Sequence, residues 1–165
     1  MSGRITASET QLRPDPKFGD EVLAKFVNCI MYSGKKTAAQ RVVYNALDLI
    51  DERLNRDANA VEGCERAIDV FRRAIDNCKP FVEVRSKRIG GANYQVPMQV
   101  KPKRQQSLAF RWVIQATRSE KGRPTHESLA DELMAAARGE GKAMATRDQT
   151  HRMAEANKAF AHFAR

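Results

Sequence analysis

Residues 82–101 read VEVRSKRIGGANYQVPMQVK, where apolar and polar side chains alternate on both sides of a glycine pair. Alternation at period two places one set of side chains on each face of a β-strand. Gly90 and Gly91 supply the positive φ angles that a tight reversal requires. The stretch therefore predicts a β-hairpin over about residues 81–101.

Pro97 limits how this hairpin can be placed. A proline lacks the backbone N–H that a central strand donates, so it is confined to edge strands. Two edge strands make a two-stranded arm outside any larger sheet, and each strand would project about 25–30 Å at roughly 3.3 Å per residue. An isolated hairpin of this kind is marginally stable in water unless it lies against another surface.

Outside the hairpin, apolar residues recur at steps of three and four, which is typical of amphipathic helices. Two capping boxes, Thr37 with Gln40 and Thr146 with Gln149, are expected at the starts of the second and the last helix. The six helices are expected near residues 20–34, 37–54, 61–79, 104–118, 124–138 and 146–161.

Together, these elements predict a mainly α protein: a six-helix, bundle-like domain with a protruding two-stranded β-hairpin arm and an extended N-terminal tail. The tail covers residues 1–19, which show no periodicity and contain Pro14, Pro16 and Gly19. Residues 20–165 are expected to form a single domain, because the length suits one core and no low-complexity linker divides them.

The charge of the chain is unevenly placed. The chain has 29 lysines and arginines against 20 acidic residues, a formal charge of +9 and an isoelectric point near 9.8. Residues 20–80 hold ten basic and ten acidic residues, whereas residues 81–118 hold eight basic residues and one acidic residue, Glu83. A charge that served solubility alone could be spread evenly, so this concentration predicts a surface that binds a phosphate backbone.

The candidate nucleic-acid contacts are the basic side chains of this segment and of nearby helices. Arg104, Arg111 and Arg118 recur at spacings of seven and should form one basic stripe on a helix. Tyr94 lies among the cations of the arm, and its ring is suited to stacking on a base. The full set consists of Lys35, Lys36, Arg41, Arg85, Lys87, Arg88, Tyr94, Lys101, Lys103, Arg104, Arg111, Arg118, Arg147, His151 and Arg152, with weaker contacts expected from Arg4, Arg13 and Lys17 in the tail.

No arrangement of residues predicts catalysis, a metal site or a cofactor. The sequence SGKKT at residues 33–37 lacks the earlier glycine and the preceding strand of a nucleotide-binding phosphate loop. The three histidines are scattered, and none of the three cysteines belongs to a CxxC pair. The first residues contain no apolar signal-peptide core and no apolar run is long enough to cross a membrane, so a reduced, cytoplasmic protein is expected.

Three stretches carry a family resemblance, in a fixed order along the chain. They are FVNCIMYSGKK at residues 26–36, VEVRSKRIGG with YQVP within residues 82–97, and HRMAEANKAFAH at residues 151–162. They resemble bacterial-type small-subunit ribosomal protein seven over about residues 20–163. The resemblance implies a helical domain with a β-ribbon arm that binds the 3′ major domain of small-subunit rRNA and nucleates assembly of the subunit head.

The same resemblance implies a location at the subunit interface near the tRNA exit site. The ninth and eleventh small-subunit ribosomal proteins would be neighbours there, and exit-site tRNA and mRNA would lie close to the arm. The main alternative is a DNA-architectural protein, because some of these also pair a helical body with a basic ribbon arm. A protein-protein adaptor built on apolar helix faces is a second alternative, and an enzyme is the least supported reading.

Overall fold

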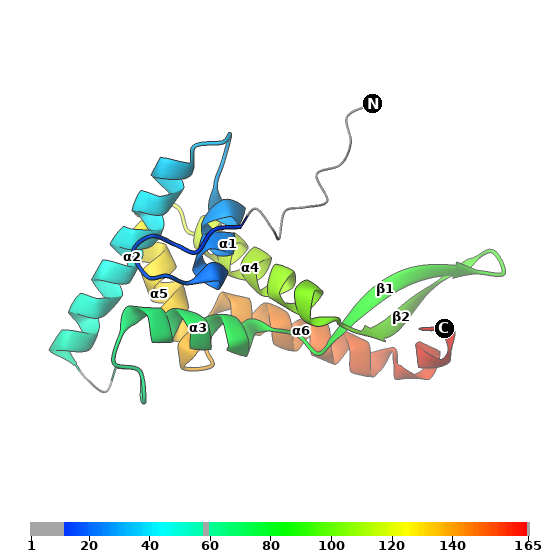
Figure 1. Ribbon diagram of the computed structural model, residues 1–165. Helices are drawn as coiled ribbons and strands as arrows, with labels where there is room; N and C mark the ends of the chain where they lie inside the picture. Colours follow the sequence, from blue (N-terminus) through cyan, green and yellow to red (C-terminus); the bar gives the residue numbers. More distant parts are fainter. Residues whose placement is uncertain (1–11, 58–59, 165) are drawn as a thin grey trace, which may run out of the picture.

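The computed structural model describes residues 12–57 and 60–164. It confirms a mainly helical protein with one antiparallel β-hairpin (Figure 1). The elements in chain order are α1 (Glu21–Ile30), α2 (Lys36–Arg56), α3 (Ala67–Cys78), β1 (Val82–Ile89), β2 (Ala92–Gln99), α4 (Pro102–Ser119), α5 (Thr125–Ala137), α6 (Lys142–Ala156) and the 3₁₀ helix η1 (Lys158–Ala164).

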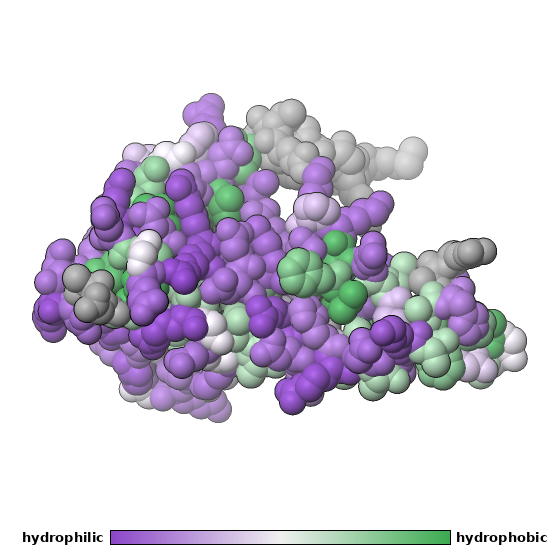
Figure 2. Space-filling view, turned by 90° about the horizontal axis from the view of Figure 1, so that it is seen from below, coloured by the Kyte–Doolittle hydropathy of each residue, from purple (hydrophilic) through white to green (hydrophobic). Residues whose placement is uncertain are grey.

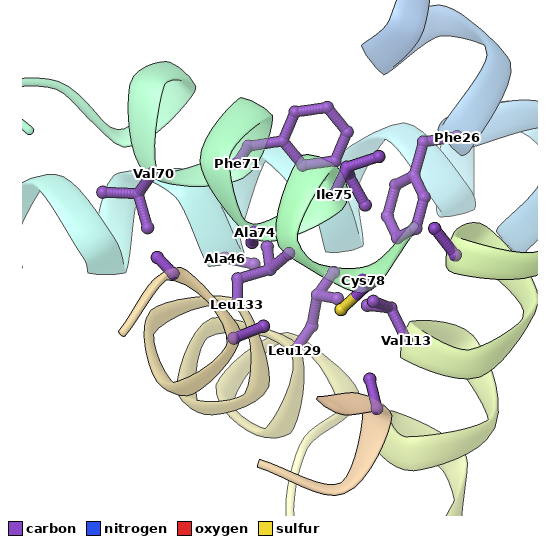
Figure 3. Packing of buried hydrophobic residues seen from close by; sticks show 14 of the residues in the cluster. Phe26, Ala46, Val70, Phe71, Ala74, Ile75, Cys78, Val113, Leu129 and Leu133 are labelled. Atoms are coloured by element: carbon purple, nitrogen blue, oxygen red, sulfur yellow. The ribbon is translucent and has the colours of Figure 1, made fainter. Parts of the chain in front are cut away.

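The core lies where α3 and α5 pack against each other and against α2 and α4 (Figure 3). Phe26 of α1 meets the edges of Phe71 and Phe110, with ring centroids 5.3 Å and 5.4 Å away. Such edge-to-face pairs stabilise a core beyond the area they bury. Leu129 and Leu133 of α5 fill the space beneath α3. Helix α5 is therefore buried on most of its surface.

The two predicted strands pair antiparallel around the predicted glycine turn. Ile89 pairs with Ala92 across the turn, where Gly90 and Gly91 have φ angles of +57° and +89°. Contrary to an arm that stands free, the hairpin is covered along one side by the C-terminal part of the chain, because β1 packs against α6 and β2 packs against η1 (Figure 1). This cover supplies the surface that a long isolated hairpin needs for stability.

The two predicted capping boxes are wrong. Helix α2 begins at Lys36 without a side-chain cap, so Thr37 lies inside its first turn. Helix α6 begins at Lys142, one turn earlier than expected, and the Thr146 hydroxyl donates to the Lys142 carbonyl over 2.9 Å. The N-terminus of α6 is instead capped from outside the helix, because the backbone N–H of Ala143 donates to Oε1 of buried Glu132 over 2.7 Å.

The first and third helices are shorter than their apolar patterns predicted. Helix α1 ends at Ile30 because Met31 is extended and Ser33 and Gly34 adopt positive φ. Val61 and Cys64 are buried but lie in the turns that precede α3, which begins at Ala67. Buried residues of a non-helical segment can therefore be spaced three or four apart, as they would be in a helix.

The last residues of the expected N-terminal tail pack on the body. Asp15 is buried, and its carboxylate accepts hydrogen bonds from the backbone N–H groups of Lys17 and Phe18 and from the Tyr44 hydroxyl of α2. A carboxylate with three donors holds this turn in place. Packing thus begins before residue 20, and the remaining tail residues, 1–11, lie outside the described part of the chain.

We expect Gly141→Ala to lower the free energy of unfolding by about 2–3 kcal/mol, and Gly139→Ala to lower it by only about 1 kcal/mol. Both glycines have positive φ, +96° and +84°, so both alanines are strained. A Cβ at Gly141 would also lie 2.9 Å from Oε1 of Glu132, the α6 cap, whereas nothing lies within 4 Å at Gly139. Urea denaturation measures both losses, and equal losses would show that the cap does not constrain this turn.

Candidate nucleic-acid interface

A stripe of three arginines runs along α4. Arg104, Arg111 and Arg118 lie seven residues apart on this helix of 18 residues, so they share one face and span most of its length of about 27 Å. The opposite face is buried and includes Ala109, Val113 and Ala116. The stripe runs from the base of the hairpin to the turn between α1 and α2. The predicted basic stripe is confirmed, and we call it the α4 stripe.

At the hairpin end, two arginines share one carboxylate. Glu83 of β1 is 8% exposed. Its Oε1 lies 2.5 Å from a guanidinium nitrogen of Arg85, and its Oε2 lies 3.2 Å from Nε of Arg104. One negative charge meets two positive ones, and the arginine side chains remain 54% and 40% exposed. The cluster therefore keeps a net positive charge and ties the arm to α4.

At the other end, Arg118 closes helix α1. Its guanidinium donates to the Ile30 carbonyl over 3.0 Å, which satisfies a carbonyl that the end of α1 leaves without a helical partner. Arg118 also lines a hollow of about 260 Å³ together with Tyr32 and Lys35. The structure thus joins the α4 stripe to the basic start of α2.

Most of the other predicted cations are exposed. Lys87 already has a partner inside the protein, because its ammonium donates to the Phe163 carbonyl over 2.9 Å. Lys103 and Lys25 both line a groove of about 320 Å³ between α1 and α4. Six further side chains are exposed and make no hydrogen bond or ion pair with another described residue: Lys36, Arg41, Arg88, Lys101, Arg111 and Arg152.

Lys25 is a candidate contact that sequence reasoning missed. It lies in the electrically balanced segment of residues 20–80, and nothing in the local pattern of α1 marks this lysine as part of a binding surface. Only the packing of α1 against α4 brings it beside Lys103.

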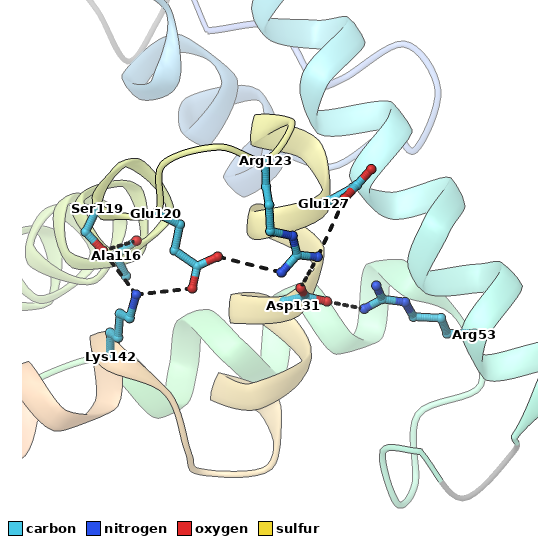
Figure 4. Close-up of polar contacts among 8 residues, drawn as sticks. All are labelled: Arg53, Ala116, Ser119, Glu120, Arg123, Glu127, Asp131 and Lys142. Atoms are coloured by element: carbon cyan, nitrogen blue, oxygen red, sulfur yellow. Dashed lines mark hydrogen bonds and ion pairs between the residues drawn. The ribbon is translucent and has the colours of Figure 1, made fainter.

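A second set of charges, which extends from α2 across α5 to the start of α6, is internally balanced (Figure 4). Asp131 pairs with Arg53 and Arg123, while Glu120 pairs with Lys142. Burial alone would raise the pKa of Asp131, but hydrogen bonds from Arg53 and Arg123 hold it below its usual range. These cations have carboxylate partners within the protein, whereas Arg111 and Arg118 of the α4 stripe pair with no carboxylate among the described residues.

Tyr94, which was predicted to stack on a base, contacts two aromatic rings of the protein itself. Its ring centroid lies 5.4 Å from those of Phe160 and Phe163 in η1, with the planes tilted. At these distances the rings are in aromatic contact. Tyr94 therefore holds the C-terminal segment against β2, and its ring is at least partly occupied by the chain itself.

Arg147 and His151 of α6 also make internal contacts. Arg147 donates to the Asn77 carbonyl at the end of α3 over 2.7 Å and pairs with Asp148. Nε2 of His151 accepts from the backbone N–H of Phe81 over 3.2 Å, and the two rings are stacked. Burial, aided by the positive charge of Arg147, lowers the pKa of His151, so the ring is neutral at pH 7. Both residues position the start of the hairpin on α6.

The predicted tail contacts have different outcomes. The ammonium of Lys17 lies 2.5 Å from a carboxylate oxygen of Asp48 and above the rings of Phe18 and Tyr44. Arg13 is exposed, and Arg4 lies outside the described residues. Lys17 is thus already used to fix the N-terminal turn on α2.

The face seen in Figure 2 is largely hydrophilic over the helical body, and hydrophobic residues gather toward the hairpin end. Within residues 12–57 and 60–164, no group of three or more His, Cys, Asp or Glu side chains could hold a metal ion. Among the described helices, none combines the length and the apolar composition needed to cross a membrane.

A helical body with an exposed row of arginines and a cationic β-arm belongs to the class of nucleic-acid-binding proteins. The family model described as Ribosomal protein S7p/S5e matches residues 2–158. The chain therefore belongs to this family, whose members are structural ribosomal proteins and not enzymes.

Relatives from several bacteria confirm the resemblance over nearly the whole chain. Small ribosomal subunit protein uS7 of Rhodopirellula baltica is 56% identical over 162 residues, which cover 98% of this chain and 99% of the relative. The proteins of that name from Methylobacterium radiotolerans and Thermotoga neapolitana are 51% and 48% identical. These alignments cover 99% and 97% of this chain, and the same shares of the two relatives.

We expect Tyr94→Ala to loosen the arm without disturbing the core. Losing two aromatic contacts should cost about 1–3 kcal/mol locally and speed amide hydrogen exchange in β1 and β2 by about 5-fold to 100-fold. Tyr94→Phe retains the ring and serves as the control. Unchanged exchange in the hairpin, or equal acceleration in α3 and α5, would contradict this role for Tyr94.

We expect protonation of His151 to destabilise the fold. The folded-state pKa of this histidine lies below its ordinary value of about 6.5, so its contribution is complete above pH 6.5 and is lost as the pH falls through the folded pKa. His151→Asn keeps an acceptor that does not titrate. Urea midpoints measured from about pH 7.5 to pH 5 should therefore fall more steeply for the wild type than for the variant, and parallel curves would contradict the assignment.

Proposed function

We propose that the chain is a structural component of the small ribosomal subunit and binds small-subunit rRNA. More specifically, we propose that it binds the 3′ major domain, nucleates assembly of the subunit head and lies near the tRNA exit site at the subunit interface. Its neighbours there would be the ninth and eleventh small-subunit proteins, with exit-site tRNA and mRNA close to the arm. The whole-length similarity to proteins named small ribosomal subunit protein uS7 supports this proposal most strongly.

The electrostatics of the chain supply the physical mechanism. Cations that contact phosphates release condensed counterions, and this release drives binding and makes it weaken as salt rises. Arginine suits such a surface because its guanidinium forks onto phosphate oxygens and stays charged. The α4 stripe, with the arm at one end and the start of α2 at the other, gives a continuous path for an RNA backbone.

The proposed contacts fall into two groups. Direct phosphate contacts are proposed for Lys25, Lys35, Lys36, Arg41, Arg85, Lys87, Arg88, Lys101, Lys103, Arg104, Arg111, Arg118 and Arg152. Tyr94, Arg147 and His151 act as positioning residues, because each of them holds the arm or α6 in place through contacts inside the protein. Contacts from Arg4 and Arg13 would extend the surface along the tail.

We expect the double variant Arg88→Gln/Arg111→Gln to weaken binding to an in-vitro transcript of the 3′ major domain. Each arginine that contacts a phosphate contributes about one to the slope of log Kd against log salt, so the slope should fall by about two. The matched control is Arg56→Gln/Arg66→Gln, which removes the same charge from the far end of α2 and the start of α3 (Figure 1). The control should leave the slope nearly unchanged.

Filter binding over a series of salt concentrations measures these slopes. Equal effects of the two double variants would mean that net charge, and not the α4 stripe with its arm, governs binding. Duplex DNA at matched salt tests the alternative of a DNA-architectural protein. Equal affinity for duplex DNA and for the ribosomal transcript would contradict the proposed function.

A further inference from the structure

The hollow beside the α1–α2 turn has properties that phosphate binding does not explain. Its volume of about 260 Å³ falls just below the roughly 300 Å³ at which pockets for drug-sized ligands begin. Most of its lining is apolar, and the described residues that line it include no acidic side chain. They are Ile30, Tyr32, Lys35, Ala38, Ala39, Val42, Arg118 and Thr125.

Tyr32 is held outward at this hollow by the backbone. Its side chain is 78% exposed, more than the other large hydrophobic residues in the described part of the chain. The turn that follows is closed by a hydrogen bond from the Lys35 N–H to the Tyr32 carbonyl over 3.1 Å. Ser33 adopts a φ of +51°, which is uncommon for a residue with a side chain and costs conformational energy. The fold thus maintains an exposed aromatic ring on a strained turn.

The charges around Tyr32 indicate what covers it. Lys35 and Arg118 line the same hollow, and Lys36 and Arg41 lie on the first turns of α2 with exposed side chains. An apolar protein segment would cover the ring but would leave these cations without counter-charges. A nucleotide supplies both a flat apolar ring and a phosphate on each side of it, so it matches the ring and the cations together.

We propose that Tyr32 stacks on an unpaired base of the bound rRNA, with that base in the hollow and its flanking phosphates on Lys35 and Arg118. This proposal rests on the proposed function, since it assigns a base contact to an otherwise electrostatic surface. Stacking on a tyrosine ring tolerates any base, so the contact should recognise an unstacked nucleotide and not a particular sequence.

The test measures binding of the 3′ major domain transcript to the full-length chain and to Tyr32→Ala and Tyr32→Phe. Loss of a stacked base should weaken binding by about 5-fold to 150-fold for Tyr32→Ala, whereas Tyr32→Phe should bind within about 2-fold of the wild type. The slope of log Kd against log salt should be the same for all three proteins, because stacking releases no counterions. Ultraviolet crosslinking should attach a nucleotide to the peptide that contains Tyr32.

Several results would overturn the proposal. The proposal fails if Tyr32→Ala binds the transcript as tightly as the wild type does. It also fails if Tyr32→Ala changes the salt slope, because that would indicate an electrostatic and not a stacking effect. Thermal unfolding checks that Tyr32→Ala is folded, and its melting temperature should change by no more than about 2 °C because the ring is exposed. If the wild type itself does not bind the transcript, the proposed function fails. If the wild type binds and Tyr32→Ala binds equally well, only the base-stacking proposal fails.

Discussion

The buried face of α4 is the contact on which the proposed interface depends. Leu108, Trp112 and Val113 pack into the core and fix the rotation of the helix, so the arginines of the α4 stripe must point outward. Adjacent arginines on the stripe are about 10.5 Å apart along the helix axis, a little more than the Debye length of about 8 Å at physiological ionic strength. Their mutual repulsion is therefore largely screened, and apolar packing can hold them in a row.

The C-terminal part of the chain extends this rigid framework to the arm. Helix α6 reaches the start of β1 through His151, and η1 reaches β2 through the rings around Tyr94. A hairpin held in this way loses less conformational freedom on binding than a free one would. The cations of the arm are thus presented in a defined direction, continuous with the α4 stripe through the shared carboxylate of Glu83.

The sequence predicted features that depend on local pattern. Alternation and the glycine pair predicted the hairpin and its turn, and the spacing of Arg104, Arg111 and Arg118 predicted the stripe. The starts of α3 and α6 were predicted wrongly, whereas the other four helices begin within two residues of their expected starts. Helix α6 is capped by Glu132 from another helix, and no local motif records such a partner.

Contacts between distant segments also decided which predicted site residues remain available. Tyr94 and His151 looked suited to binding RNA, but residues far away in the sequence occupy them in the fold. Lys25 and Tyr32 are the opposite case. Each carries an ordinary local signal, and each gains a candidate role only because folding brings it beside Lys103 or Arg118.

Arginine modification of the protein bound to rRNA tests most directly whether the cationic path contacts RNA. Phenylglyoxal should label Arg88, Arg111 and Arg118 much more slowly in the complex than in the free protein, while Arg56 and Arg66 should react at the same rate in both. Equal protection of all five arginines, or protection of Arg56 and Arg66 alone, would contradict an interface that follows α4 from the arm to the α1–α2 turn.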